Sequence, residues 1–298
     1  MTPPDTDRID QACREAGVDR QALRRIEERV EADVKASRYD GARVMMARGG
    51  VTVLDLTIGY AHRDSGKPMQ RDSVFSVMSI SKVMTAVALL QRVERGQISL
   101  LTPVAQVIPE FAQRGKGLVT IGQILTHTAG MSMNQPALPV DQLGQLDKSV
   151  AAICALPLET APGEQVSYSA MMGYTILGEV VRRLDAAGRP LRTILDEDVF
   201  GPLGMRDTAW GMRAHFEGRR VPVVVRDADA PELNRKFISE RDNSVIESTE
   251  LPSGGATFST AQDILRFAEA LRQHGALDGQ RVLSPAMVQL MTRNQTGS

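Results

Sequence analysis

Residues 75–82 read Phe-Ser-Val-Met-Ser-Ile-Ser-Lys, and they mark a change from a strand-like pattern to a helical one. From Ser79 onward, apolar residues recur at spacings of three and four until Gly96, which predicts a helix that ends there. Lys82 is the only one of the six lysines with a serine three residues before it, Ser79. Because residues three apart in a helix lie on one face, the Cβ atoms of Ser79 and Lys82 should be about 5–6 Å apart.

The Ser79–Lys82 pair has the chemistry of a nucleophile and its base. A serine hydroxyl is a poor nucleophile until a base takes its proton, and a lysine can be that base where its surroundings keep it neutral. Backbone N–H groups at the start of the predicted helix would lie where an oxyanion develops. The same two residues also fit a solvated position on a helix surface, and the spacing alone leaves both interpretations open.

A second candidate group is Tyr168, one of four tyrosines, which follows Pro162-Gly163 and precedes a helix predicted over residues 169–184. A phenol can act as a base or proton relay when a lysine ammonium stabilises its phenolate. A tyrosine in this place also fits a packing role against the start of the helix. Ser169 has the residue type of a helix N-cap.

The flanking sequence predicts a mixed α/β (α+β) fold. Two β-like runs, residues 42–47 and 51–58, flank Arg48-Gly49-Gly50 and predict a hairpin. Residues 221–225 contain four valines and are the best further strand candidate. Further helices are predicted from apolar residues at helical spacing, over residues 20–37, 119–126, 147–154, 261–273 and 285–292.

Strands come first along the chain, helices follow, and a mixed region comes last, which predicts an α/β body with a helical insertion. We expect residues 1–74 to hold the N-terminal helix and the first hairpin of the α/β domain. Residues 75–205 should form a helical domain, and residues 206–298 should return to the α/β domain.

The composition excludes several classes of protein. Of 298 residues, 42% are hydrophobic, and 35 basic side chains nearly balance 36 acidic ones, so neither nucleic acid nor membrane is expected as a partner. The two cysteines, Cys13 and Cys154, are too few for a disulfide scaffold or a four-thiolate zinc site. The polar residues 1–10 do not resemble a signal peptide, and no apolar stretch reaches about 18 residues. We therefore expect a cytoplasmic protein.

Taken together, these segments resemble the serine β-lactamase and penicillin-binding protein family, and most of all its class C-like proteins and the esterases called family VIII. Each motif is weak alone, but the order and spacing along most of the chain are specific. The motifs that carry the resemblance are Gly66-Lys-Pro-Met69, Phe75 with Ser79 and Lys82, Gly96–Leu100 with Pro103, Ile124–Gly130, Pro162-Gly163 before Tyr168, Gly201–Met205 and Gly254–Thr260.

The resemblance implies a fold and roles for three residues. The fold would be an antiparallel sheet flanked by helices, with an inserted all-helical domain. Ser79 would be the nucleophile that forms an acyl-enzyme, Lys82 its base, and Tyr168 a base and proton relay. The implied activity is that of a carboxylesterase acting on a small-molecule ester or amide, with no cofactor and no metal ion. The resemblance does not imply an oligomeric state.

Other activities fit the same resemblance. A β-lactamase, a D-amino-peptidase, an acyltransferase and a non-catalytic penicillin-binding-like module all share this fold. An esterase of the α/β-hydrolase fold is disfavoured, because the chain contains no G-x-S-x-G motif.

The sequence departs from the family pattern in two places. The tyrosine motif of the family often reads Y-x-N, and its asparagine amide helps to hold a β-lactam, but this chain has Ala170 there. Ester hydrolysis is therefore favoured over β-lactam hydrolysis. The third motif (K-T-G, or H/W-x-G in the esterases) is not found before Ser298. We expect an incomplete sheet as a result, with a strand edge left exposed or paired with another chain.

Three further residues have types that attract attention, and structural roles are predicted for all of them. His127 belongs to a loop after a short predicted helix in the family pattern. Trp210 is expected in the core or in a cleft wall, and Cys154 is expected as a small core residue.

Overall fold

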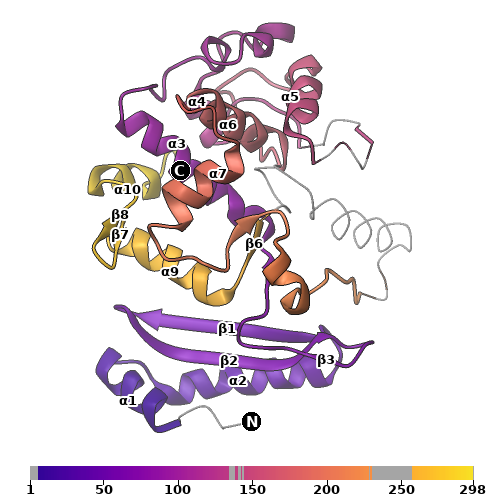
Figure 1. Cartoon of the computed structure of the whole chain (residues 1–298), viewed down its shortest axis with the longest axis vertical. Coiled ribbons are helices and arrows are strands. Elements are labelled where there is room, and N and C mark those ends of the chain that lie inside the picture. The colour runs from indigo at the N-terminus through magenta and orange to yellow at the C-terminus, as the bar shows by residue number, and fades with distance from the viewer. Residues whose placement is uncertain are drawn as a thin grey trace.

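An antiparallel sheet of three strands lies at one end of the molecule, with helices on both of its faces (Figure 1). The computed structural model describes residues 6–133, 138, 139, 142, 144–227, 229 and 257–297. The sheet has the order β1-β2-β3, with β1 (Gly41–Arg48), β2 (Val51–His62) and β3 (Lys67–Pro68). Helices α1 (Thr6–Ala16) and α2 (Arg20–Lys35) cover one face, and α9 (Ala261–Arg272) lies against β1 on the other.

The hairpin forms because its turn has the residues that it needs. Gly49 and Gly50 both adopt positive φ angles, of 59° and 86°, which glycine reaches without the steric cost that a side chain brings. Beneath the strands, apolar residues of the helices meet those of β2 in a small core of Cys13, Leu23, Val53 and Leu54.

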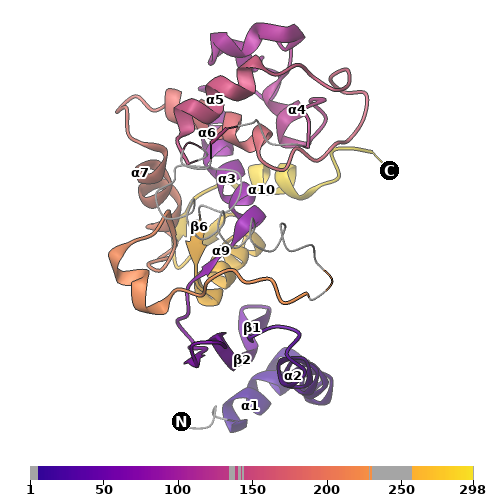
Figure 2. The same cartoon turned by 90° about the vertical axis from the view of Figure 1, so that its right-hand side faces the viewer.

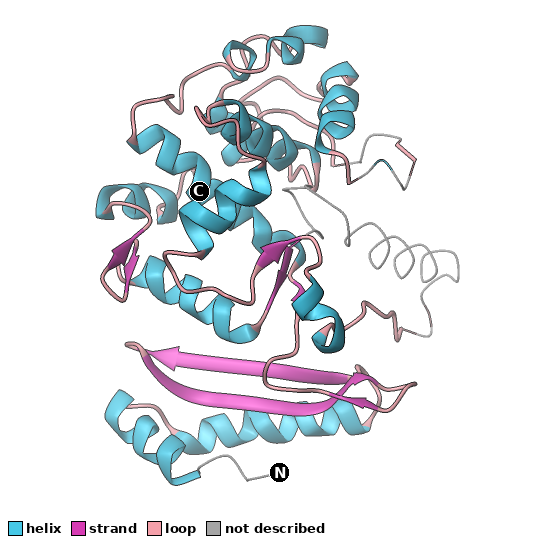
Figure 3. Ribbon diagram, in the orientation of Figure 1, coloured by secondary structure: helices cyan, strands magenta, loops and turns pink. Residues whose placement is uncertain are grey.

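The rest of the molecule is mainly helical (Figure 3). Helix α3 (Ser81–Glu94) is buried along most of its length and packs against α6 (Met172–Arg183) and α7 (Leu191–Leu195). Helices α4 (Ile121–Leu125) and α5 (Leu146–Ala155) pack against α6. Figure 2 shows this helical part at the end opposite α1 and α2. Short 3₁₀ or π segments span Met78–Ile80, Val104–Gln106, Pro109–Gly115, Asp196–Phe200 and Ala214–Arg219.

A second, very short antiparallel sheet joins three distant parts of the chain. Its order is β4-β6-β5, with β4 (Phe75–Ser76), β6 (Thr257–Ser259) and β5 (Ala209–Trp210). Because β4 ends three residues before Ser79, this sheet fixes the position of the candidate nucleophile. The hairpin of β7 (Ala276–Leu277) and β8 (Gln280–Arg281) and the helix α10 (Pro285–Thr292) follow α9.

Helix α3 is anchored at its far end by charged and polar contacts. The buried guanidinium of Arg92 lies 3.5 Å from Asp185 and 3.3 Å from Asp198. The amide of Gln91 donates to the carbonyl oxygens of Asp198 and Val282. These contacts hold the helix that carries Lys82 against two later segments of the chain.

Most of the predicted elements are present. The hairpin and the helices near residues 20–37, 119–126, 147–154, 169–184, 261–273 and 285–292 all form, within a few residues of the predicted bounds. Trp210 and Cys154 are buried in the core as predicted. The domain boundaries at residues 75 and 205 stay a prediction.

The prediction of a strand over residues 221–225 is wrong, because these residues adopt no regular structure. The N–H of Val221 donates a hydrogen bond to the carbonyl oxygen of Val74, although no strand forms there. Helix α1 and the second sheet were not predicted. Gly254 and Gly255 lie outside the described residues. Within the described part of the chain, β1 is an edge strand, paired with β2 alone.

Candidate active site

Ser79 lies on a 3₁₀ turn, Met78–Ile80, directly before α3. The sequence placed it in the helix itself, and the difference arises at Met78, whose φ of 45° interrupts the helical path. The hydroxyl of Ser81 donates to the carbonyl oxygen of Met78 (2.5 Å) and holds this turn. As a result the chain bends sharply after β4, and Ser79 is exposed at the amino-terminal end of α3.

Lys82 lies in the first turn of α3, and its side chain is buried. Its Nζ donates a hydrogen bond to Ser79 Oγ over 3.1 Å. Burial lowers the pKa of the Lys82 ammonium. The hydrogen bond with Tyr168 and the negative charge of the Tyr168 phenolate raise this pKa, but burial outweighs them. A lowered pKa raises the fraction of neutral amine, which is the form that can accept a proton from Ser79.

Tyr168 lies on the loop before α6, and its Oη is 2.8 Å from Ser79 Oγ. Burial alone would raise the pKa of this phenol. Hydrogen bonds with Ser79 and Lys82 and the charge of Lys82 outweigh burial, so the pKa of Tyr168 is lowered from its usual value. The Lys82 Nζ lies 5.2 Å from the centre of the Tyr168 ring.

The structure thus brings together all three residues that the sequence singled out for the site. They come from a turn, from the start of α3 and from the loop before α6. Their polar atoms form a chain in which Ser79 Oγ lies between a buried amine and a phenol. This arrangement can remove a proton from Ser79 and pass it to a second group.

Two neighbours of this site were not predicted to belong to it. The ring of His127 lies 4.8 Å from that of Tyr168, measured between centroids. The ring of Tyr174 lies 5.5 Å from His127 and 6.0 Å from Lys82 Nζ. The Ile124–Gly130 motif was the available signal for His127, but sequence alone did not show which residue the histidine contacts.

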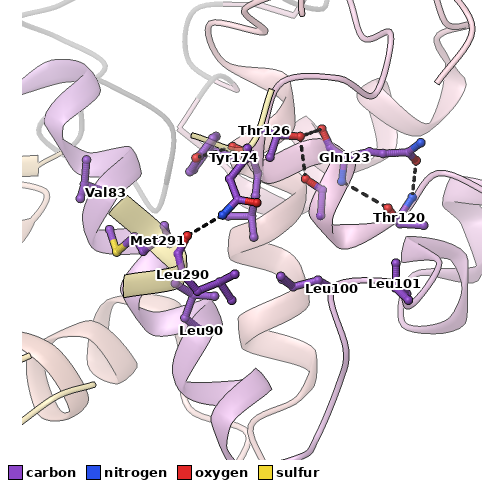
Figure 4. A pocket seen from close by; sticks show the side chains of 14 residues that line it. Val83, Leu90, Leu100, Leu101, Thr120, Gln123, Thr126, Tyr174, Leu290 and Met291 are labelled. Atoms are coloured by element: carbon purple, nitrogen blue, oxygen red, sulfur yellow. Dashed lines mark hydrogen bonds between the residues drawn. The ribbon is translucent and has the colours of Figure 1, made fainter. Parts of the chain in front are cut away.

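An apolar cavity of about 480 Å³ lies beside α3 and shares Tyr174 with the surroundings of the site (Figure 4). Val83 and Leu90 of α3 and Leu290 and Met291 of α10 line it. Ser79, Lys82 and Tyr168 are absent from its wall. The cavity is therefore separate from the polar groups that could carry out chemistry.

Among the described residues, no group of three or more His, Cys, Asp or Glu side chains could hold a metal ion. The helices in that part of the chain also lack the length and apolar character needed to cross a membrane. The expectation that no metal or cofactor takes part stays a prediction.

Comparison with known proteins gives one family match and many relatives. Residues 26–298 match the family described as Beta-lactamase. Esterase EstB of Burkholderia gladioli is 33% identical over 267 residues, which cover 80% of this chain and 67% of the esterase. The first curated relatives that the chain matches are covered over 62–67% of their own length.

Two solved structures have a similar fold. A family VIII carboxylesterase is 27% identical, with a TM-score of 0.75 and coverage of 90% of this chain and 74% of that one. A penicillin-binding protein homologue from Caulobacter crescentus is also 27% identical, with a TM-score of 0.76 and coverage of 98% and 76%.

Proposed function

The chain belongs to the beta-lactamase family, and we propose that it cleaves small-molecule carboxylic esters as a serine hydrolase, through an acyl-enzyme. The family match confirms the predicted family, and the two similar structures confirm the predicted fold. The observation that carries the proposed activity is the position of Ser79 Oγ, 3.1 Å from Lys82 Nζ and 2.8 Å from Tyr168 Oη. Similarity to an esterase and to a carboxylesterase structure supports esters as the substrate class.

In the proposed reaction, Ser79 Oγ attacks the ester carbonyl carbon while its proton passes to the neutral Lys82 amine or to the Tyr168 phenolate. We expect the negative oxygen of the tetrahedral intermediate to lie near the amino-terminal end of α3, where the helix dipole favours negative charge. The leaving alcohol takes the proton, and the acyl group stays on Ser79. A water molecule, deprotonated by the same pair, then releases the acid and restores the hydroxyl.

Labelling by a fluorophosphonate probe tests the proposal against a non-catalytic module of the same fold. The probe reacts with an activated serine, so it should attach to Ser79, and peptide mapping identifies the modified residue. A chain that hydrolyses no ester and takes up no probe would be the binding module instead.

Replacing Tyr168 with phenylalanine should lower kcat by about 10²-fold, the usual scale of a general acid–base contribution. Only the hydroxyl is lost, and the residue is 43% exposed, so the thermal unfolding midpoint should hardly change. Tyr60→Phe is the matched control, because Tyr60 is 38% exposed and lies on β2, away from the site. If Tyr168→Phe stays within twofold of wild type, Tyr168 has a packing role.

Short-chain esters should be hydrolysed faster than penicillins, by at least about tenfold in kcat/KM. Ala170 has no amide to hold the side-chain amide of a β-lactam, and one missing hydrogen bond of this kind costs about 1–3 kcal/mol. Steady-state kinetics on a p-nitrophenyl ester and on penicillin G give the ratio. Ala170→Asn should narrow it, and a penicillin rate equal to the ester rate in the unchanged chain would contradict the proposal.

We also propose a cytoplasmic location. Cys13 and Cys154 are both free, buried thiols, which agrees with a reducing compartment.

A further inference from the structure

His127 adopts a backbone conformation that most residues avoid. It follows α4, with a φ of 56°, in the left-handed region that glycine and asparagine reach more readily than histidine. Its N–H donates to the carbonyl oxygen of Ile124 (3.1 Å) as the helix ends. This conformation directs both the carbonyl oxygen and the ring of His127 to the loop that carries Tyr168.

His127 contacts the residue before Tyr168 and the residue after it. The N–H of Ser167, the residue before, donates to the carbonyl oxygen of His127 over 2.8 Å. The N–H of Ser169, the residue after, donates to Nδ1 of the His127 ring over 3.3 Å. The tyrosine ring itself packs on the imidazole, with 4.8 Å between centroids. One residue thus contacts the backbone on each side of Tyr168 and also its ring.

The contact with Ser169 requires a neutral imidazole. Nδ1 can accept the Ser169 N–H only when the ring proton is on Nε2. Burial lowers the pKa of His127, and the nearby charge of Lys82 lowers it further, so the neutral form is favoured. The Ser169 hydroxyl, 3.4 Å from Nδ1, is a second possible donor to the same nitrogen.

We propose that His127 is a positioning residue that holds the Tyr168 hydroxyl within reach of Ser79. The inference rests on the proposed function, since Tyr168 matters for turnover only if Ser79 is the nucleophile. A reacting group displaced by about 1 Å can cost about 10²-fold in rate. Loss of the acceptor at Nδ1 should therefore lower kcat while KM changes little.

Two amide substitutions separate this role from a general structural one. In His127→Asn the side-chain oxygen can occupy the place of Nδ1, whereas the longer side chain of His127→Gln carries its oxygen beyond that place. We expect kcat to fall by about tenfold to a hundredfold in His127→Gln and by less than about threefold in His127→Asn. His274 has the same φ of 56° and is exposed. The difference in unfolding midpoint between His274→Asn and His274→Gln therefore measures how far asparagine is favoured over glutamine by this backbone conformation alone.

A second readout does not depend on turnover. Titration of tyrosinate absorbance in the ultraviolet, with Tyr168→Phe to assign the signal, reports whether Tyr168 still contacts Ser79 and Lys82. The low-pKa tyrosine should persist in His127→Asn and move toward the usual pKa of about 10 in His127→Gln. An unchanged titration and an unchanged kcat in His127→Gln would overturn the inference. If wild type hydrolyses no ester, the proposed function fails, while the titration still tests the positioning.

Discussion

Replacing Ser79 with alanine is expected to abolish ester hydrolysis, by at least about 10³-fold in kcat, while the protein keeps its fold. The Ser79 hydroxyl touches both Lys82 and Tyr168, so its loss removes the atom on which the proposed acyl-enzyme forms. The side chain is exposed, and little packing is lost with it. Circular dichroism and thermal unfolding should therefore match wild type.

Ser284→Ala is the control for this variant. Ser284 is the N-cap of α10 and accepts the N–H of Met287, so its loss should cost about 1 kcal/mol of stability and leave kcat unchanged. Turnover in Ser79→Ala within tenfold of wild type would show that another residue is the nucleophile.

Replacing Lys82 with methionine should lower kcat by at least about 10²-fold without loss of stability. The amine is the buried base in the proposed reaction, and methionine has a similar length but cannot accept a proton. Burial of the amine is unfavourable for its charged form, which is why the pKa of Lys82 is lowered. An apolar side chain avoids this cost, so the unfolding midpoint should stay the same or rise.

Lys116 offers a matched comparison, because it is also a buried lysine. Its Nζ donates to the carbonyl oxygens of Cys154 and Leu156 at the end of α5. Lys116→Met leaves these carbonyls without that donor and should cost about 1–3 kcal/mol of stability, with kcat of the folded protein unchanged. Kinetics and thermal unfolding on both variants check the pair. Equal kcat losses in the two variants would contradict the assignment of Lys82 as the base.

The parts of the site that are local in sequence could be predicted from it. Ser79 and Lys82 are three residues apart, so helical geometry alone brings them together, and the bend at Met78 does not change this. Tyr168 was singled out by its position between Pro162-Gly163 and a predicted helix, and the family resemblance then implied its role. The contacts of His127 were not predictable in this way, because they depend on a left-handed backbone and on backbone N–H groups some forty residues away.

The fold shows the same division between local and distant information. The hairpin has two β-like runs that flank a turn with two glycines, so its sequence was sufficient. Strands β4, β5 and β6 have two or three residues each, and strands of this length are too short to show any periodicity. They also pair with segments that are distant in the sequence. The valines of residues 221–225 favour a strand, but strand propensity depends strongly on tertiary context, and these residues adopt no regular structure.

Helix α1 was missed for a different reason. Its sequence is mostly polar, and only a few apolar residues, among them Ile9 and Cys13, face the sheet. A narrow apolar stripe of this kind is stabilised by tertiary packing more than by helix propensity, so the isolated pattern was weak.

The proposed acyl-enzyme is tested most directly by mass spectrometry of the protein, quenched in acid during hydrolysis of a p-nitrophenyl ester. The protein should gain the mass of one acyl group, peptide mapping should place this group on Ser79, and Ser79→Ala should gain none. Tyr168→Phe, if it slows deacylation, should raise the acylated fraction. Ester hydrolysis with no acylated protein, or with the acyl group on another residue, would rule out the proposed acyl-enzyme at Ser79.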